Sequence, residues 1–197
     1  MIHAEHDHHV RDLRIGGMQT LVIIDAQNEF SPDGRRAVLD HASAIAAIQR
    51  RIDAARANDL PIAWVRHHNL PHEWPAFEPG SWGADYTSGF GPAPDRPQER
   101  EFVKSVLGAF TGSELGAWLT EIGSDDVLIA GFYTHMCVST TAREALMRGL
   151  RVSIDPDGTR APALDHALLG SLSAEEARRS ALLHLHDLGV NLTPYSG

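Results

Sequence analysis

Asp25, Lys104 and Cys137 have side chains that can together break an amide bond, and each comes shortly after an apolar run of the sequence. A thiol is a strong nucleophile once a neighbouring base has taken its proton. A carboxylate can act as that base, while an ammonium beside both groups keeps the carboxylate ionised and offsets negative charge on the substrate. These three residue types therefore suit hydrolysis through a covalent intermediate.

Cys137 is the only cysteine of the chain and stands where a strand-like run, residues 127–130, leads through a short loop into a helical pattern. Unpaired amides and the dipole at a helix start favour negative charge, so this position predicts a lowered thiol pKa and amides that can bind an oxyanion. A lone cysteine is more often a small buried apolar residue. Its position and its neighbours favour the catalytic interpretation.

Asp25 and Lys104 also have ordinary interpretations when each is taken alone. A strand-end Asp can start a turn or cap a helix, although Asn28 and Ser31 could serve as caps instead. Most lysines are solvated surface charges. Asp25 ends a run of four apolar residues, however, and the carboxyl end of such a strand is where open parallel sheets bind ligands.

Short aliphatic or β-branched runs alternate with longer amphipathic stretches from residue 19 onward. This alternation is typical of βαβ units and predicts an α/β fold with a mostly parallel sheet. The six predicted strands are residues 20–24, 61–65, 101–103, 127–130, 151–154 and 190–192.

Four segments carry apolar residues at helical spacing and are predicted helices. We expect Asp40 to be the N-cap of the first. The last opens with a capping box, Ser173 and Glu176, and ends at Gly189. The four helices run through Ile48, Trp118, Ala142 and Leu185.

The segment 67–100 is predicted to be irregular, because it holds six of the eleven prolines and four glycines. A long irregular connection in a compact domain is usually functional, and we expect a pocket wall, a lid or a subunit contact. Its aromatic residues are Trp74, Phe77, Trp82, Tyr86 and Phe90.

The composition fits one globular domain, since 197 residues with 43% hydrophobic and 22% charged side chains can bury a full-sized core. We expect residues 18–197 to form that domain and residues 1–17 to be a polar extension. Its histidines could bind a metal, but an extension without a function is the favoured interpretation. They are His3, His6, His8 and His9.

The net charge is −9 and no run of Lys or Arg stands out, so neither a nucleic-acid partner nor an anionic membrane is expected. A small-molecule substrate is the expected partner. One cysteine cannot form a disulfide within the chain, and no signal peptide or apolar run of membrane-spanning length is visible. We expect a cytoplasmic protein.

Four segments carry motifs whose order and spacing match one family. They read Leu-Val-Ile-Ile-Asp25-Ala-Gln-Asn-Glu-Phe30; Pro79-Gly-Ser-Trp-Gly-Ala84; Phe102-Val-Lys104 with Ala109-Phe110-Thr111; and Gly131-Phe-Tyr-Thr-His-Met-Cys137-Val with Thr141, Ala142, Arg143 and Gly149. Together they resemble the isochorismatase-like cysteine hydrolases, which include nicotinamidases, carbamoylsarcosine hydrolases and related amidases. The resemblance spans residues 18–193.

This resemblance implies a three-layer, doubly wound sheet of about six strands flanked by helices. Asp25 would be the base that takes the proton of Cys137, Lys104 would orient and polarise, and the backbone amides of Tyr133 and Cys137 would form the oxyanion hole. It also implies a cis peptide bond between Phe132 and Tyr133. Family members are commonly dimers to octamers, so we expect a homo-oligomer, a dimer or a tetramer.

The sequence departs from the nicotinamidases of this family, which hold a metal with an Asp-x-His motif and a further His after the second strand. Here the segment reads Trp64-Val-Arg-His-His68, without the Asp. His67, His68 and His72 could still supply imidazole ligands, but a structural or pocket role is favoured without a carboxylate. We expect no metal and no cofactor.

An aromatic pocket wall is predicted, although two or three of its members could instead be ordinary core residues. The ring nitrogens of His67, His68 and His72 could also bind a substrate oxygen. The predicted substrate-binding residues are Phe30, Trp64, His68, Trp82, Phe110 and Tyr133.

The favoured activity is cleavage of a C–N bond of a small amide, carbamoyl or ureido compound through a thioester on Cys137. True isochorismatases cleave a vinyl ether and need no cysteine nucleophile, so Cys137 argues against that reaction. A non-catalytic binding module is another alternative on the same fold. A redox sensor is a third, since an exposed thiol of low pKa oxidises readily, but this chain has no second cysteine to resolve it.

Overall fold

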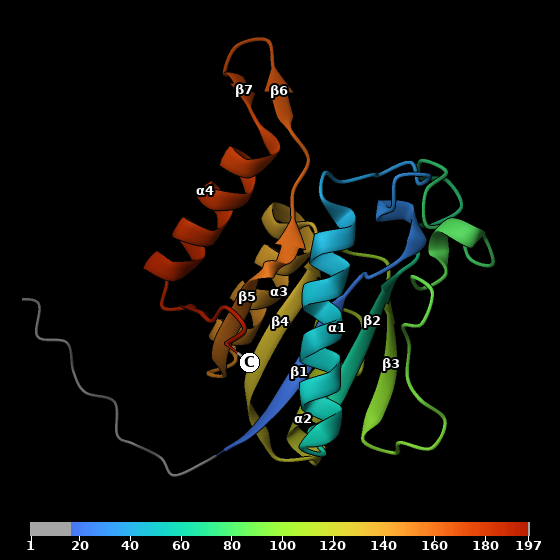
Figure 1. Cartoon of the computed structure of the whole chain (residues 1–197), viewed down its shortest axis with the longest axis vertical. Helices are drawn as coiled ribbons and strands as arrows, with labels where there is room; N and C mark the ends of the chain where they lie inside the picture. The colour runs from blue at the N-terminus through green and yellow to red at the C-terminus, as the bar shows by residue number, and fades with distance from the viewer. Residues whose placement is uncertain (1–16, 197) are drawn as a thin grey trace, which may run out of the picture.

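A sheet of six parallel strands forms the centre of the structure, a computed structural model that describes residues 17–196 (Figure 1). The strands are β1 (Met18–Ile24), β2 (Ile62–His67), β3 (Glu99–Lys104), β4 (Ser124–Phe132), β5 (Arg151–Arg160) and β8 (Asn191–Leu192). They lie in the order β3-β2-β1-β4-β5-β8, and every neighbouring pair is parallel. All six predicted strands are confirmed.

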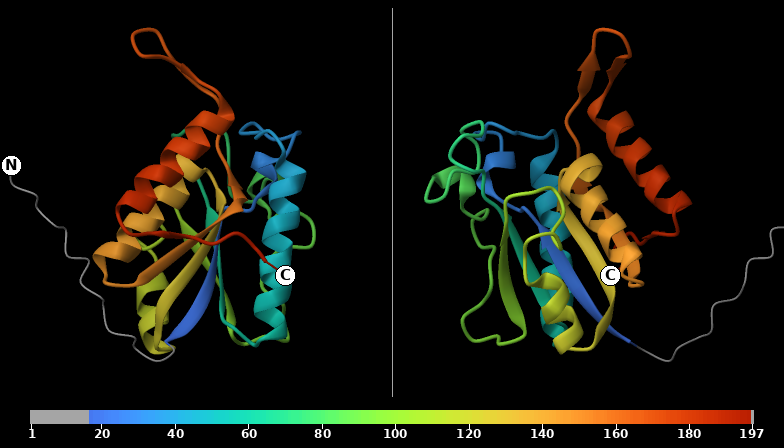
Figure 2. Two further views of the ribbon diagram at one scale, coloured as in Figure 1. Left: turned by 60° about the vertical axis from the view of Figure 1, so that its left-hand side comes forward. Right: turned by 180° about the vertical axis from the view of Figure 1, so that it is seen from behind.

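Helices cover both faces of this sheet, as Figure 2 shows. They are α1 (His41–Ala57), α2 (Leu115–Glu121), α3 (Ser139–Met147) and α4 (Ala174–Asp187). One core cluster joins the sheet to α1, and the other joins its opposite face to α2, α3 and α4. The predicted three-layer α/β fold is therefore confirmed.

β1 is buried on both faces because its alternate side chains enter the two cores. Leu21 and Ile23 pack in the cluster that contains Ile48 of α1, whereas Val22 and Ile24 belong to the cluster on the other face. A strand buried on both sides needs a continuous apolar run rather than an alternating one. The run before Asp25 has this character.

The direction of winding reverses at β1, and this reversal brings three strand ends together. From β1 the chain winds outward through β2 to β3 and then returns to β4 on the other side of β1. Ligands bind at such a switch point, outside the carboxyl ends of the strands. Gly131 of β4 lies so close to β1 that a Cβ there would be 1.9 Å from the carbonyl oxygen of Ile24. Only glycine fits at this position.

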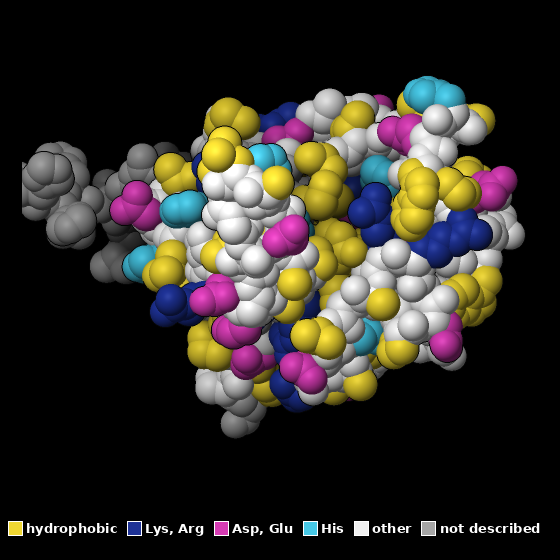
Figure 3. Space-filling view, turned by 90° about the horizontal axis from the view of Figure 1, so that it is seen from above, with side chains coloured by type: hydrophobic (Ala, Val, Ile, Leu, Met, Phe, Trp, Pro, Cys, Tyr) yellow, Lys and Arg dark blue, Asp and Glu magenta, His cyan; other side chains and the backbone are white. Residues whose placement is uncertain are grey.

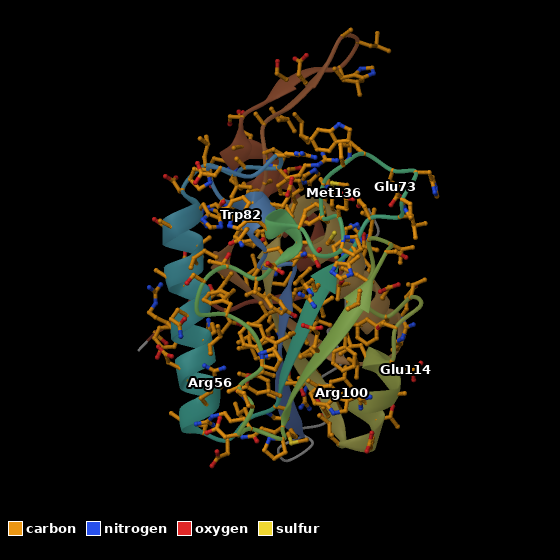
Figure 4. The ribbon with its side chains drawn as sticks, turned by 90° about the vertical axis from the view of Figure 1, so that its right-hand side faces the viewer. Arg56, Glu73, Trp82, Arg100, Glu114 and Met136 are labelled. Carbon is orange, nitrogen blue, oxygen red and sulfur yellow. The ribbon has the colours of Figure 1, made fainter. Side chains whose placement is uncertain are left out.

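The connection from β2 to β3 folds over this edge of the sheet. Apart from one helical turn, Trp82–Ala84, it has no regular structure before β3. The side-chain amide of Gln27 fixes its path by donating to the carbonyl oxygens of His67 at 2.9 Å and Ala84 at 2.8 Å. Figure 4 shows Glu73 of this connection beyond the carboxyl ends of the strands.

Two local expectations need correction, and one hairpin was not expected. β3 begins at Glu99, inside the segment predicted to be irregular. Asp40 does precede α1, but its φ is 52° and its side chain makes no capping hydrogen bond. The hairpin of β6 (Leu164–His166) and β7 (Gly170–Leu172) was not predicted, because all its residues are exposed and no buried face imposes an alternating pattern.

The capping box that begins α4 is confirmed. Ser173 Oγ accepts from the backbone amide of Glu176 at 3.3 Å, and the Glu176 carboxylate accepts from the backbone amide of Ser173 at 2.8 Å. Gly189, with φ of 99°, follows the end of the helix as predicted. These bonds satisfy amides that the first turn leaves unpaired.

The proposed metal-binding histidines of the extension, His3, His6, His8 and His9, lie outside the described residues. Within residues 17–196, no helix has both the length and the apolar character needed to cross a membrane.

Candidate active site

Asp25, Lys104 and Cys137 meet at the carboxyl edge of the sheet. Lys104 Nζ donates to Asp25 Oδ2 at 2.8 Å and lies 3.3 Å from Cys137 Sγ. All three side chains are buried, with exposed fractions of 1%, 2% and 8% in chain order. The structure thus brings together the three residues that were selected from the sequence.

Each member of this group is positioned by the end of a different strand. Asp25 follows β1 in a left-handed conformation, with φ of 52°, which Asp adopts more readily than most residues. Lys104 is the last residue of β3 and lies beside His67 in the register of β2. Cys137 lies in the wide helical turn Thr134–Val138, which leads from β4 into α3.

Burial and the charge of Asp25 raise the pKa of Cys137 to about 12, although Lys104 acts in the opposite direction. The resting site therefore holds a thiol rather than a thiolate at neutral pH. The expectation of a lowered thiol pKa is wrong, because burial and the charge of Asp25 outweigh the opposing effect of Lys104.

Burial alone would lower the pKa of Lys104, but Asp25 and Cys137 outweigh burial and raise it above the ordinary value. Lys104 is therefore an ammonium with a carboxylate on one side and a thiol on the other. Asp25 Oδ1 is buried and has no hydrogen-bond partner among the described residues. This oxygen is free to accept a proton.

His67 is a fourth member of the group that the sequence did not identify as such. Its Nδ1 lies 3.1 Å from Lys104 Nζ, and its Nε2 lies 2.8 Å from Asn69 Oδ1. Burial, and after it the charge of Lys104, lowers the pKa of His67. A neutral ring can accept from the ammonium at Nδ1 and donate to Asn69, so each of the three Lys104 protons has a partner in Asp25, Cys137 or His67.

The residues after β2 do not fit a metal. Both ring nitrogens of His67 are already engaged, and among residues 17–196 no three His, Cys, Asp or Glu side chains converge. His68 does not face the cavity at the site, and His72 is exposed.

A cavity of about 510 Å³ opens above Asp25 and Cys137. Phe30, Phe77 and Tyr133 form aromatic walls around it. Figure 3 shows hydrophobic side chains gathered in a hollow on this face. A cavity of this size with polar groups at its floor suits a small molecule.

Two of the six predicted substrate-binding residues, Phe30 and Tyr133, line this cavity. Their rings meet edge to face, with centroids 4.8 Å apart. The hydroxyl of Tyr133 donates to the backbone carbonyl of Arg36 at 2.7 Å, which fixes this wall to the loop after β1.

The other four predicted lining residues lie elsewhere. Trp64 is the register partner of Ile23 and points into the core beneath α1, where its indole donates to Glu99 at 2.9 Å. Phe110 packs in the opposite core, with Arg148 over its ring. His68 and Trp82 belong to the connection after β2 but do not line the cavity, and Trp82 is 53% exposed.

Sequence reasoning missed several residues that do line the cavity. Trp74 and Phe77 were noted as aromatic residues of the irregular segment, and this was the available signal for them. Nothing in the sequence singled out the rim residues Arg36, Glu73 and Met136.

The loop after Lys104 is tied to the helix that follows Cys137. Thr141 Oγ1 accepts from the amide of Ala109 at 3.1 Å, and Glu144 Oε2 accepts from the amide of Phe110 at 2.9 Å. The hydroxyl of Thr111 donates to the other oxygen of Glu144. These bonds hold the loop that supplies one rim of the cavity.

The peptide bond between Phe132 and Tyr133 is cis, which confirms that expectation. It immediately precedes the turn that contains Cys137. The assignment of the Tyr133 and Cys137 amides as an oxyanion hole stays a prediction.

The sequence of this chain is similar to those of known proteins. The family model described as "Isochorismatase domain" matches residues 19–190. The secreted isochorismatase effector Isc1 of Verticillium dahliae is 31% identical, over 79% of this chain and 81% of that protein. The nicotinamidase/pyrazinamidase of Mycobacterium tuberculosis is 28% identical, over 85% of this chain and 98% of its own length.

Solved structures share the fold. An isochorismatase from Pseudomonas putida KT2440 superposes with a TM-score of 0.82 at 29% identity, covering 89% of this chain and 87% of that one.

Proposed function

Because the chain belongs to the isochorismatase family of hydrolases, we propose that it cleaves a C–N bond of a small amide, carbamoyl or ureido compound through a thioester on Cys137. The observation that carries this proposal is the buried contact of Lys104 with both Asp25, at 2.8 Å, and Cys137, at 3.3 Å. Asp25 and Cys137 line a cavity sized for a small molecule.

In the first half of the reaction, Asp25 takes the thiol proton while Cys137 Sγ attacks the substrate carbonyl carbon. The free oxygen Oδ1 is suited to receive this proton, because Oδ2 is held by Lys104. The backbone amides of Tyr133 and Cys137 bind the oxyanion, and Lys104 limits the electrostatic cost of forming negative charge in a buried site.

Collapse of the tetrahedral intermediate breaks the C–N bond, and protonated Asp25 returns its proton to the leaving amine or ammonia. Asp25 then removes a proton from water, which attacks the thioester carbonyl carbon. The C–S bond breaks, the acid is released, and the proton returns to the sulfur. Atoms and protons balance over the two halves without a cofactor.

The competing functions fit the site less well. Ether cleavage of the isochorismatase type needs no cysteine nucleophile, so it would not explain why Cys137 lies beside Asp25 and Lys104. Redox sensing needs an accessible thiolate, whereas Cys137 is buried and its pKa is raised to about 12. The name of the mycobacterial relative denotes an amide hydrolase, which supports the C–N assignment.

The test is ammonia release from a panel of primary amides and ureides by wild type, Cys137→Ala and Asp25→Asn. We expect turnover by wild type and a loss of roughly a thousandfold or more in both variants. Mass spectrometry of the quenched wild-type reaction should show an acyl group on Cys137. Turnover that survives Cys137→Ala, or hydrolysis of isochorismate in place of amides, would overturn the proposal.

We also propose that the protein acts in the cytoplasm on a small molecule as a homo-oligomer, a dimer or a tetramer. Leu168 and Leu169 at the tip of the β6–β7 hairpin are 84% and 81% exposed, which supports a contact that covers them. Light scattering of the purified protein tests the oligomer, and cell fractionation tests the location.

A further inference from the structure

Arg36 is a positive charge at the rim of the cavity that the thioester mechanism does not use. Its backbone amide donates to the carbonyl of Glu29 at 3.0 Å, and its own carbonyl accepts from the Tyr133 hydroxyl at 2.7 Å. Its guanidinium lies over the ring of Trp74, 4.9 Å from the centroid. The backbone of Arg36 is therefore fixed on both sides, and its exposed side chain lies against Trp74.

The guanidinium of Arg36 has no carboxylate partner among residues 17–196, and none of its five donors makes a hydrogen bond there. Stacking on an aromatic face leaves the edge of the guanidinium, which carries the donors, open to a ligand. A planar fork of this kind matches a carboxylate with two parallel hydrogen bonds.

Two carboxylates, those of Asp25 and Glu73, line the cavity with Arg36, and neither forms an ion pair with it among residues 17–196. The charge of Asp25 is offset by Lys104 at 2.8 Å. Glu73 is engaged in its own turn, because its Oε2 accepts from the Leu70 amide at 2.5 Å while its amide donates to the Leu70 carbonyl. Figure 4 shows Glu73 on a loop at the edge of the molecule.

Arg36 and Cys137 line the same cavity. The Tyr133 side chain links the turn that contains Cys137 to the loop that carries Arg36, because its hydroxyl donates to the Arg36 carbonyl. The space between is bounded by the rings of Phe30, Phe77 and Tyr133. Flat apolar walls suit an aromatic ring or a short apolar chain.

We propose that Arg36 binds a carboxylate at the end of the substrate opposite the scissile amide, so that the natural substrates are singly charged anions that carry an amide or ureide. One guanidinium matches one negative charge, which favours a carboxylate over a doubly charged phosphate. This inference rests on the proposed amide hydrolysis and adds to it the charge of the substrate.

The experiment uses three benzamides that differ only at the para position. 4-Carbamoylbenzoate carries a carboxylate, 4-nitrobenzamide carries a neutral group of the same shape, and 4-(aminomethyl)benzamide carries a cation. Their binding to Cys137→Ala is measured by calorimetry, which does not depend on turnover. Ammonia release by the enzyme with Cys137 intact gives kcat and KM in parallel.

We expect the carboxylate to bind on the order of tenfold more tightly than the nitro compound, because hydrogen bonds to a charged partner are among the stronger ones. Arg36→Glu should abolish this preference or reverse it toward the cation, mainly through KM. Arg36→Lys should keep part of it. Arg35→Glu, which makes the same charge change on a residue that does not line the cavity, should leave it unchanged.

Equal or weaker binding of the carboxylate, or a preference that survives Arg36→Glu, would overturn the inference. If wild type prefers the cationic benzamide, Glu73 and not Arg36 determines which charge the cavity binds. If the binding preference is found but no amide is hydrolysed, only the proposed reaction fails; if Cys137-dependent hydrolysis is found without the preference, only the role of Arg36 fails.

Discussion

The ammonium of Lys104 lies 3.1 Å from Nδ1 of His67, and this contact is attractive only while the His67 ring is neutral. A protonated ring would place two positive charges side by side in a buried site. The state of His67 therefore affects the same lysine that holds Asp25 and Cys137.

The first prediction concerns acid. Burial and Lys104 lower the pKa of His67 below 6.5 in the folded protein, so the folded state disfavours the protonated ring. This contribution to stability is present above pH 6.5 and is lost as the pH falls through the lower folded pKa. Denaturant unfolding between pH 5 and 8 should show the loss, and His67→Gln should reduce its slope.

His41 provides the matched control, because burial lowers its pKa as well but it does not contact Lys104. His41→Gln should also flatten the dependence of unfolding free energy on acid pH. Only His67→Gln should change how kcat/KM falls as the pH is lowered below about 6.5. An unchanged activity profile in His67→Gln would contradict the link to Lys104.

The second prediction compares the rate at which the Cys137 thiol is alkylated with the rate of hydrolysis. Because the pKa of Cys137 is about 12 through burial and the charge of Asp25, iodoacetamide should label the resting wild type slowly at pH 7. Asp25→Asn removes the charge that opposes thiolate formation, so labelling should become several-fold faster while hydrolysis falls by roughly a thousandfold or more. Rapid labelling of wild type at neutral pH would disprove the protonated resting state.

The third prediction concerns the buried ion pair. Lys104→Met leaves Asp25 as an unpaired buried carboxylate and should lower the free energy of unfolding by about 3–5 kcal/mol. Adding Asp25→Asn removes the unpaired charge and should recover part of this loss. Urea unfolding of the two single variants and the double variant measures the coupling, and simple additivity would count against a strong pair.

The fourth prediction tests the link between the loop after Lys104 and α3. Glu144→Ala leaves the buried amide of Phe110 without its acceptor and should cost about 1–3 kcal/mol of stability. KM should rise more than kcat falls, because the loop supplies Val106 and Leu107 to the cavity. The exposed Glu121→Ala serves as a control, and equal effects of both changes would show that the loop bonds are not responsible.

Much of the site could be predicted because it sits at strand ends. The apolar run before Asp25 marks a central parallel strand, and the strand-to-helix change around Cys137 marks the same edge of the sheet. Since parallel strands end together, placing these residues near one another required only the strand order. Lys104, the last residue of β3, joins them because β3 runs in the same direction.

The pocket walls could not be predicted in the same way. Trp64 faces the core because its register with Ile23 determines which side of the sheet it occupies. Phe77 and Trp74 reach the cavity only because tertiary bonds, such as those of Gln27, direct the irregular connection over the edge. The raised pKa of Cys137 likewise depends on how completely neighbouring segments remove water from the thiol.

The bond from Lys104 to Asp25 joins residues 79 positions apart, and its contact with Cys137 bridges another 33. Contacts of such long range form late, because the intervening loops must be closed first. No partly folded chain that lacks any one of β1, β3 or β4 can hold the three groups together. Recovered hydrolysis after dilution from denaturant would therefore report the finished sheet, and it should lag behind the recovery of helical circular dichroism.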